Sequence, residues 1–282
     1  MAGSVRRRAL ITGAAGGMGQ ACARLFGTVQ DLVLTDAAAP ALERFAGELR
    51  AEGFTVLGAH AGDLGSNAEL AAMMADMASE NPLTLIHTAG LSPALAGPEA
   101  IMAVNLVATV KLLDAIQPLL RPGSAAVLIA SIAGHLIPEI PAALALMAAP
   151  LAPDFMERIG QLIAGMSQGD AQKAGGISYA LSKQAVLKLT QTRALAWGPL
   201  GARITSISPG LILTPMGRKE LARTDGAAAM QNAAPLGRPG VATDIARAAQ
   251  YLASDAASFI TGTDLLVDGG AMAALRRGGM QL

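Results

Sequence analysis

The sequence predicts a single-domain α/β fold of the doubly wound class, in which a seven-stranded parallel sheet lies between two layers of helices. Two observations lead to this prediction. Short apolar segments alternate with longer helical patterns along the 282 residues, which is the order typical of parallel sheets. The composition is 52% hydrophobic but only 3% aromatic, and small aliphatic residues suit strands that are buried on both faces. No linker, repeat or low-complexity segment indicates a second domain.

The first predicted strand, residues 9–11, runs directly into a glycine-rich turn at residues 12–19. A helical pattern follows, so the helix N-terminus offers free N–H groups and the positive end of its dipole to an anion. This order of strand, turn and helix indicates that the turn binds the pyrophosphate of a dinucleotide. The alternative is a tight turn that needs glycine only for its backbone dihedral angles.

The second predicted strand, residues 31–35, ends in Asp36. An acidic side chain about 20 residues beyond such a turn can accept hydrogen bonds from the adenosine ribose and would repel a 2′-phosphate. No Arg or Lys lies at this strand end or in the glycine turn to hold that phosphate. The sequence therefore favours NAD over NADP. The alternative is that Asp36 caps a helix at residues 37–50.

The third predicted strand, residues 55–59, leads to Asp63 and Leu64. Asp63 either meets the edge of an adenine or caps the helix that follows. That helix is predicted at residues 68–78.

The fourth predicted strand, residues 83–87, is followed by the small residues Ala89 and Gly90. The next helix, predicted at residues 98–120, carries Asn105 among apolar neighbours. A buried amide is costly unless it is hydrogen-bonded. Asn105 therefore either ties backbone segments together or holds a water molecule.

The fifth predicted strand, residues 125–130, ends at Ser131, where ligands of a doubly wound sheet gather. Further along, Ser178 is the predicted N-cap of a helix that carries Tyr179 and Lys183. At this spacing both side chains project from one helix face. A nearby ammonium favours a phenolate, so Lys183 is expected to lower the pKa of Tyr179 toward the range of a proton-transfer catalyst. The alternative is an amphipathic helix with an ordinary tyrosine and a solvated lysine.

The last part of the chain completes the predicted sheet with strands at residues 203–208 and 264–267 and a helix at residues 242–253. A turn at residues 209–214 follows the sixth strand. Residues 215–240 are rich in Gly, Ala and Met and are expected to form a mobile lid over a substrate, unless they are simply a long surface loop.

Composition excludes several classes of function. Lys plus Arg equals Asp plus Glu at 21 each, which gives no electrostatic basis for binding nucleic acid or an anionic membrane. The lone Cys22 excludes an internal disulfide, and the three histidines have no metal-ligand spacing. No stretch predicts a signal peptide or a membrane span, so the protein is expected to be cytoplasmic.

Taken together, these signals resemble the short-chain dehydrogenase/reductase family over essentially the whole chain. The residues that carry the likeness are Thr12, Gly13, Gly17 and Gly19, Asp36, Asp63 and Leu64, Ala89 and Gly90, Asn105, Ser131, Tyr179 and Lys183, Pro209, Gly210 and Thr214, and Val267 to Gly270. The resemblance implies a Rossmann sheet and hydride transfer between a nicotinamide and a secondary alcohol or ketone.

The resemblance also implies a role for each catalytic residue. Tyr179 would be the acid or base on the alcohol oxygen, which Ser131 would hold by a hydrogen bond. Lys183 would lower the pKa of Tyr179 and hold the nicotinamide ribose, and Asn105 would position a water molecule behind it. Cofactor contacts are implied for Gly13, Gly17, Met18, Gly19, Asp36, Asp63, Leu64, Ala89, Gly90, Tyr179, Lys183, Pro209, Gly210, Ile212 and Thr214, and no metal is implied.

The chain departs from the family pattern in two places. The usual Asn-Asn-Ala-Gly after the fourth strand reads His87-Thr88-Ala89-Gly90, and Ser131 and Tyr179 are separated by a surplus at about residues 135–175. Bacterial 3α-hydroxysteroid dehydrogenase/carbonyl reductases are similar in carrying a helical insertion there. We expect residues 138–147 to wall the substrate cleft and a helix at residues 155–166 to pack at a subunit interface, with a homodimer slightly favoured over a tetramer.

Three functions compete at this point. The leading one is an NAD-dependent dehydrogenase of a bulky apolar alcohol or ketone, similar in size to a hydroxysteroid or a terpenoid. The second is a reductase of smaller or acyl-linked ketones. The third is a non-catalytic protein that senses NAD(H) on the same fold, which the intact Ser131, Tyr179 and Lys183 disfavour.

Overall fold

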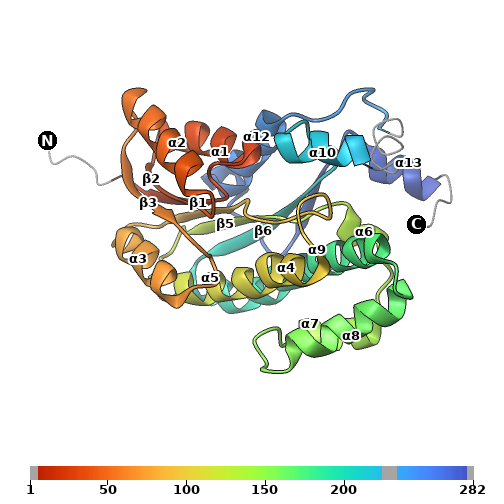
Figure 1. The fold of residues 1–282 in the computed structure, drawn as a ribbon. Coiled ribbons are helices and arrows are strands. Elements are labelled where there is room, and N and C mark those ends of the chain that lie inside the picture. Colours follow the sequence, from red (N-terminus) through yellow and green to blue (C-terminus); the bar gives the residue numbers. More distant parts are fainter. Residues whose placement is uncertain (1–5, 224–233, 278–282) are drawn as a thin grey trace, which may run out of the picture.

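The computed structural model describes residues 6–223 and 234–277. Within these residues, seven parallel strands form one sheet in the order β3-β2-β1-β4-β5-β6-β7 (Figure 1). The strands are β1 (Arg8–Thr12), β2 (Asp31–Asp36), β3 (Val56–Ala61), β4 (Thr84–His87), β5 (Ala125–Ile129), β6 (Arg203–Pro209) and β7 (Asp264–Val267). The predicted doubly wound sheet is confirmed, and every strand end lies within about two residues of its expected position, as is usual for such boundaries.

The strand order reverses between β1 and β4. Strand β1 pairs with β2 on one side and with β4 on the other, so that Thr12 lies opposite Thr35 and His87. Because all strands run in one direction, their carboxyl ends meet at one edge of the sheet, and ligands bind in the crevice at the reversal point. The glycine-rich turn leaves β1 at this edge.

Helices cover both faces of the sheet (Figure 1). One layer contains α1 (Gly17–Gly27), α2 (Ala39–Ala51) and α12 (Ala242–Ala253), and the other contains α3 (Asn67–Met77), α4 (Pro98–Met102), α5 (Thr109–Ile116) and α9 (Ala171–Trp197). Successive side chains of a strand point to opposite faces. Ile11 therefore packs in the core that contains Phe26, while its neighbour Leu10 packs in the core that contains Trp197.

The predicted helix at residues 98–120 is not one continuous α-helix. Between α4 and α5 lies a π-helical segment, η1 (Ala103–Ala108), and a 3-10 turn, η2 (Gln117–Leu119), ends the run. Asn105 lies inside the π-helical segment. Such segments recur at functional sites because the extra residue re-aims nearby groups.

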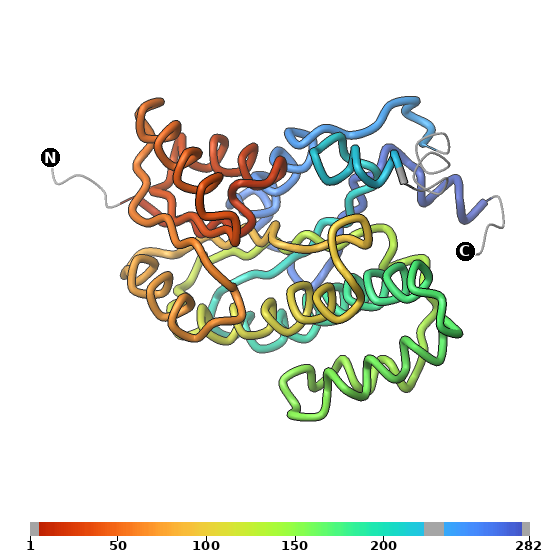
Figure 2. The backbone as a smooth tube through the Cα atoms, viewed as in Figure 1, coloured from red at the N-terminus to blue at the C-terminus, as the bar shows by residue number. Residues whose placement is uncertain are grey.

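The insertion forms an additional layer outside the helices on one face. It consists of α7 (Pro141–Met147) and α8 (Phe155–Ser167), which Figure 2 shows below α4 and α9. Buried residues of α8, among them Phe155, Ile159 and Ile163, form one cluster with Met102 of α4 and Leu181 of α9. The expectation that α8 packs on another subunit is therefore wrong for these side chains, because the same chain covers them.

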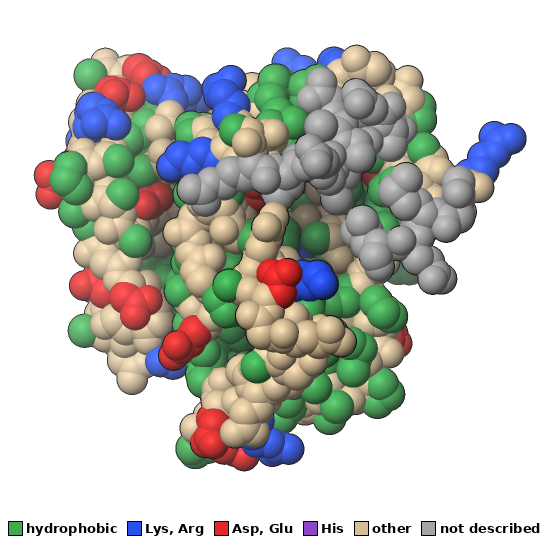
Figure 3. Space-filling view, turned by 45° about the vertical axis from the view of Figure 1, so that its right-hand side comes forward, with side chains coloured by type: hydrophobic (Ala, Val, Ile, Leu, Met, Phe, Trp, Pro, Cys, Tyr) green, Lys and Arg blue, Asp and Glu red, His purple; other side chains and the backbone are tan. Residues whose placement is uncertain are grey.

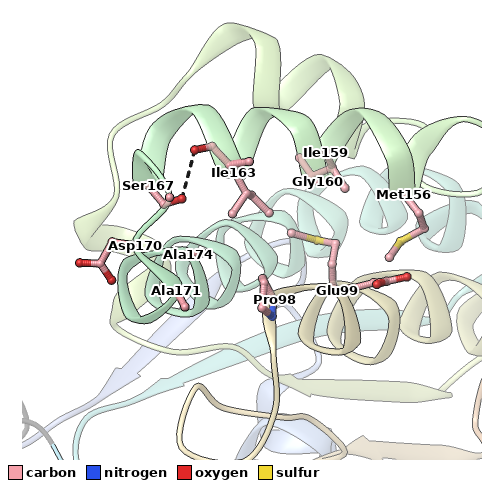
Figure 4. A pocket seen from close by; sticks show the side chains of 13 residues that line it. Pro98, Glu99, Met156, Ile159, Gly160, Ile163, Ser167, Asp170, Ala171 and Ala174 are labelled. Carbon is pink, nitrogen blue, oxygen red and sulfur yellow. Dashed lines mark hydrogen bonds between the residues drawn. The ribbon is translucent and has the colours of Figure 1, made fainter.

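A pocket of about 320 Å³ remains between α8, α4 and the start of α9. In Figure 4, Met156 and Ile163 point from α8 toward the other two helices. Ser167 near the end of α8 donates a hydrogen bond to the carbonyl of Ala164 at 3.2 Å. The pocket is lined mostly by apolar side chains and does not contain the catalytic candidates.

The helix of the catalytic tyrosine begins earlier than the sequence predicts. Gln168 has a positive φ of 54° and ends α8, and Asp170 is the N-cap of α9, accepting hydrogen bonds from the N–H groups of Gln172 and Lys173. Ser178 lies inside the helix, where its hydroxyl donates to the carbonyl of Pro98 at 2.7 Å. The predicted N-cap role of Ser178 is therefore wrong.

Smaller elements complete the described residues: α6 (Ala133–Leu136), η3 (Gly198–Leu200), α10 (Pro215–Arg223), η4 (Asp255–Ala257) and α13 (Ala271–Arg277). The predicted lid, about residues 211–240 when the end of the preceding turn is included, contains α10, and its part at residues 224–233 lies outside the described residues. No helix among those described has the length and apolarity to cross a bilayer. Figure 3 shows basic and acidic side chains interspersed on the face in view rather than gathered by sign.

Candidate active site

The glycine-rich turn brings backbone segments into close contact. Gly13 has a φ of +64°, and a Cβ on it would lie 2.8 Å from the N atom of Ala89. A Cβ on Gly19 would lie 2.1 Å from the carbonyl oxygen of Gly13. Helix α1 then begins at Gly17 without an acidic residue in its first turn and without a side-chain cap. The turn therefore presents uncovered N–H groups at a helix N-terminus, which suits a pyrophosphate.

Asp36 at the end of β2 lies against this turn. Its Oδ2 atom accepts a hydrogen bond from the N–H of Ala15 at 3.0 Å, and its Oδ1 atom accepts one from the N–H of Ala38 at 2.9 Å. The second bond lies before α2, whose N-cap is Ala38 and has no side-chain cap, so Asp36 does not cap that helix as the alternative predicts. Since a carboxylate has further acceptor sites, Asp36 can serve both the turn and the hydroxyls of a ribose.

Ser131, Tyr179 and Lys183 come together at the carboxyl end of β5. Tyr179 and Ser131 interact through a side-chain hydrogen bond. Lys183 donates from Nζ to the carbonyl of Ile129 at 2.8 Å, and its Nζ atom lies 5.8 Å from the centre of the Tyr179 ring. A Cβ on Gly134 would lie 2.7 Å from the backbone of Lys183. Because Gly134 has no Cβ, α6 can pack directly against the backbone of α9 at Lys183, close to Ser131.

Asn105 ties three segments together, which is one of the two roles that the sequence left open. Its Oδ1 atom accepts from the N–H of Leu91 at 2.7 Å, and its Nδ2 atom donates to the carbonyl of Leu91 at 2.9 Å and to Ser182 Oγ at 3.1 Å. The amide thus links the π-helical segment, the loop after β4 and helix α9.

One cleft joins these groups. Its volume is about 1080 Å³, and it extends from Met18 and Thr214 beside the glycine turn to Tyr179 and Lys183. Predicted cofactor contacts that line it are Met18, Gly90, Tyr179, Lys183, Pro209, Gly210, Ile212 and Thr214. Gly17 supports this wall, since a Cβ there would lie 2.8 Å from the Thr214 side chain. The cleft therefore holds Ser131, Tyr179 and Lys183 beside the glycine-rich turn.

Comparisons with known proteins agree with this geometry. A family model described as short chain dehydrogenase matches residues 7–143, and one described as Enoyl-(Acyl carrier protein) reductase matches residues 141–272. A short-chain dehydrogenase/reductase of Alternaria brassicicola is 31% identical over 266 residues, which are 93% of this chain and 95% of the relative. The chain belongs to the short-chain dehydrogenase/reductase family.

Two further likenesses extend this result. The 3-alpha-hydroxysteroid dehydrogenase/carbonyl reductase of Comamonas testosteroni is 33% identical over 199 residues, covering 68% of this chain and 73% of that protein. The crystal structure of a short chain dehydrogenase from Burkholderia cenocepacia J2315 in complex with NADP has a TM-score of 0.72 at 22% identity, covering 94% of this chain and 98% of that one. The resemblance seen in the sequence is thus confirmed, and this short-chain dehydrogenase/reductase is an oxidoreductase by family.

The electrostatics of the Tyr179 site differ from the prediction. Burial, and to a smaller degree the nearby Glu220 carboxylate, raise the pKa of Tyr179 to about 12, although the hydrogen bond with Ser131 lowers it. Burial lowers the pKa of Lys183 to about 8, against the effect of Glu220. The expected lowering of the Tyr179 pKa by Lys183 is wrong for this structure, because burial dominates and Lys183 is not among the groups that shift this pKa.

Other predicted contacts lie away from the cleft. Asp63 is exposed, and its Oδ1 atom accepts from the N–H of Gly65 at 2.8 Å, so it caps its own turn. Leu64 is buried in the core. Ala89 lies behind the glycine turn and donates from its N–H to Thr12 Oγ1 at 3.2 Å. A contact of Asp63 with an adenine, and of Leu64 with the cofactor, stays a prediction.

The sequence did not reveal two parts of the site. Glu220 of α10 lines the cleft, although it is the third of three consecutive charged residues that look like a solvated surface. His87 was visible only as a departure from the family pattern. In the structure its ring is buried, with Nδ1 2.8 Å from Thr12 Oγ1 and Nε2 2.8 Å from Thr109 Oγ1. Neither role has a local sequence signal, since each depends on contacts between distant segments.

Proposed function

We propose that this protein is an NAD-dependent dehydrogenase/reductase that interconverts a secondary alcohol and its ketone, with a substrate that is bulky and largely apolar. The observation that carries the proposal is the meeting of Ser131, Tyr179 and Lys183 on the wall of a cleft that continues to the glycine turn. Turnover of a panel of secondary alcohols, hydroxysteroids included, with NAD⁺ and with NADP⁺ tests it. Absence of turnover across the panel would contradict it.

The proposed mechanism assigns proton transfer to Tyr179. In oxidation the deprotonated oxygen of Tyr179 takes the proton of the alcohol, and in reduction the protonated phenol gives its proton to the ketone oxygen. Ser131 donates a hydrogen bond to the same substrate oxygen and holds it in place. The nicotinamide dinucleotide supplies the hydride acceptor or donor when bound and, in its oxidised form, a positive charge.

Lys183 and Asn105 act around this centre in the proposal. The Lys183 ammonium binds a ribose hydroxyl of the nucleotide and lies 5.8 Å from the centre of the Tyr179 ring. Asn105 holds the loop at Leu91 against α9 and so keeps the cleft wall in position. A water molecule held near Asn105 would connect the lysine to solvent. The glycine turn, with Gly13, Gly17 and Gly19, takes the pyrophosphate.

Cofactor choice is expected to depend on Asp36. We expect kcat/KM to be at least about tenfold higher with NAD(H) than with NADP(H), because the carboxylate repels a 2′-phosphate. Asp36→Asn should lower the preference for NAD(H) over NADP(H), since asparagine has nearly the same size as aspartate but carries no negative charge. The matched control is Asp31→Asn, at the other end of the same strand. Steady-state kinetics with both cofactors measure the ratio, and equal or better use of NADP(H) by the wild type would rule the proposal out.

The lining of the cleft supports a substrate with an apolar body. Leu91, Pro93, Ile137, Ile177 and Met216 all lie on its walls. Pro138 also lines it, but α7 does not, since Ala143 and Met147 are buried among the helices of the outer layer. The expected cleft wall at residues 138–147 is therefore right only at its start. A reductase of smaller or acyl-linked ketones is the alternative, and the panel distinguishes the two by substrate size.

We propose that the protein forms a homo-oligomer, with a dimer favoured. Support comes from β7, the edge strand of the sheet, where Leu265 and Leu266 are 37% and 36% exposed. Phe259 just before it is fully exposed, and Tyr251 of α12 is 48% exposed. Apolar side chains grouped at a sheet edge are typical of a subunit interface. Light scattering of the intact chain tests the dimer.

Loosening the insertion is expected to destabilise the protein. Ile159→Asp places a charge among the buried residues that α8 shares with α4 and α9, so the free energy of unfolding should fall by about 3 kcal/mol or more. The exposed helix faces should then promote association. Thermal unfolding and light scattering measure both effects, and Gln161→Asp, on the exposed side of α8, is the control. An unchanged melting temperature and mass for Ile159→Asp would contradict the packing role.

A further inference from the structure

Helix α10 carries an acidic side chain where its packing calls for an apolar one. One face of this helix is turned toward the protein and consists of Met216, Gly217, Glu220 and Leu221. The opposite face is exposed and includes Arg218 and Lys219. That face lines the cleft through Met216, Gly217 and Glu220. A charged residue on the inward face of an amphipathic helix contradicts the local pattern, and such contradictions are typical of functional positions.

Glu220 is also the only acidic side chain among the described residues that line the cleft. The other charged groups on these walls are Lys183 and Lys173, and the titratable phenol is Tyr179. The rest of the lining is mainly apolar or backbone. One carboxylate among mainly apolar walls lies in surroundings of low polarity, so its charge interacts strongly with any donor or charge that a ligand brings into the cleft.

The Glu220 carboxylate lies within electrostatic reach of the reacting groups. Its charge raises the pKa of both Tyr179 and Lys183. Burial raises the pKa of Glu220 itself, while the hydroxyl of Ser92 and the charge of Lys183 lower it. Ser92 is buried in the loop whose neighbours Leu91 and Pro93 line the cleft. Glu220 therefore lines the same cleft as Tyr179 and Lys183 and influences both of them.

We propose that Glu220 determines substrate specificity by accepting a hydrogen bond from a second hydroxyl group of the substrate and by excluding substrates that carry a carboxylate. The inference rests on the proposed function and refines it: the substrate has an apolar body, a reacting secondary alcohol or ketone, and one further hydroxyl on the α10 side. A hydrogen bond to a charged acceptor discriminates by about 10- to 100-fold. A buried negative charge rejects a second one by at least as much.

A set of probes on one ring separates these effects. The probes are cyclohexanol, its 1,2-, 1,3- and 1,4-diols, and 4-hydroxycyclohexanecarboxylate, together with one hydroxysteroid with and without a second hydroxyl. We expect the wild type to prefer at least one diol over its mono-alcohol by about tenfold or more in kcat/KM and to reject the carboxylate. Glu220→Leu should abolish the diol preference. Glu220→Gln keeps the size and an acceptor, so it should keep part of that preference and admit the carboxylate.

The matched control is Lys219→Gln, an exposed change on the same helix that should leave every ratio unaltered. A binding measurement with NADH and a melting curve accompany each variant. If Glu220→Leu does not fold, the isosteric Glu220→Gln still tests the exclusion of the carboxylate. Equal losses on all probes with unchanged ratios would assign Glu220 a structural role and overturn the inference. If the wild type oxidises no alcohol with either cofactor, the proposed function fails instead.

Discussion

Replacing Tyr179 by Phe is expected to lower kcat by about two orders of magnitude or more and to change NAD(H) affinity little. The substitution keeps the ring, which walls the cleft, and removes only the oxygen that exchanges a proton with the substrate. Positioned acid–base groups contribute this much to rate. Single-turnover hydride transfer, followed by NADH absorbance, measures the loss, and titration with NADH measures cofactor affinity.

The chain provides a matched control for this experiment. Its only other tyrosine is Tyr251, which is 48% exposed on α12, so Tyr251→Phe should retain wild-type kinetics. Near-wild-type kcat in Tyr179→Phe would disprove the proton-transfer role. A parallel loss of NADH binding would show instead that the phenol supports the cleft.

The strands and the glycine turn could be predicted because their signals are local. A run of apolar residues followed by glycines is readable over about ten positions. The helix of Tyr179 was placed too far along the chain because Gly175 and Gly176 look like a helix end. In the structure both lie inside α9, whose start is fixed by the Asp170 cap. Gly175 is buried there, and a Cβ on it would lie 3.4 Å from Pro93. A small residue at a packing contact and a helix breaker have the same sequence signal.

The electrostatics of the site could not be predicted from spacing alone. The spacing of Tyr179 and Lys183 predicts that they share one face of a helix, but it does not predict that both are buried. Nor does it predict that a third ionisable group, Glu220 of α10, lies in the same cleft. For the same reason the surplus between Ser131 and Tyr179 could be recognised as an insertion, but its packing partner could not. The apolar side chains of α8 pack against α4 and α9, and the positions of these helices follow only from the three-dimensional fold.

His87 occupies a fully connected network in the core, and its hydrogen bonds fix its tautomer. Thr109 donates its only hydroxyl proton to the carbonyl of Asn105 at 2.9 Å, so His87 must donate from Nε2 to Thr109. Its Nδ1 atom then accepts from Thr12, whose hydroxyl oxygen accepts from the N–H of Ala89 at 3.2 Å. The neutral ring therefore joins the end of β1, the end of β4 and the start of α5, and a second ring proton would break the bond from Thr12.

This network predicts a loss of stability in acid. Burial, and to a lesser degree the charge of Lys183, lowers the pKa of His87 from 6.5 to about 3. In the unfolded chain His87 becomes protonated below about pH 6.5, whereas in the folded chain it stays neutral until the pH falls to about 3. Folding stability from this group is thus complete above pH 6.5 and declines as the pH falls toward 3. By pH 4 the loss is on the order of 3 kcal/mol.

Replacing His87 by Asn, the residue usual in the family, is expected to flatten this decline. Denaturant unfolding of both proteins at pH 7 and at pH 4 gives the difference, and the carboxylates that titrate in both cancel from it. The variant should be less stable at pH 7, because its shorter side chain leaves a cavity and at least one unpaired hydroxyl. Its further loss between pH 7 and pH 4 should be smaller than that of the wild type by about 3 kcal/mol. His60→Asn on the edge strand β3 is the control. Parallel losses in the wild type and His87→Asn would mean that His87 takes up its proton in the folded state, and the neutral network would then be wrong.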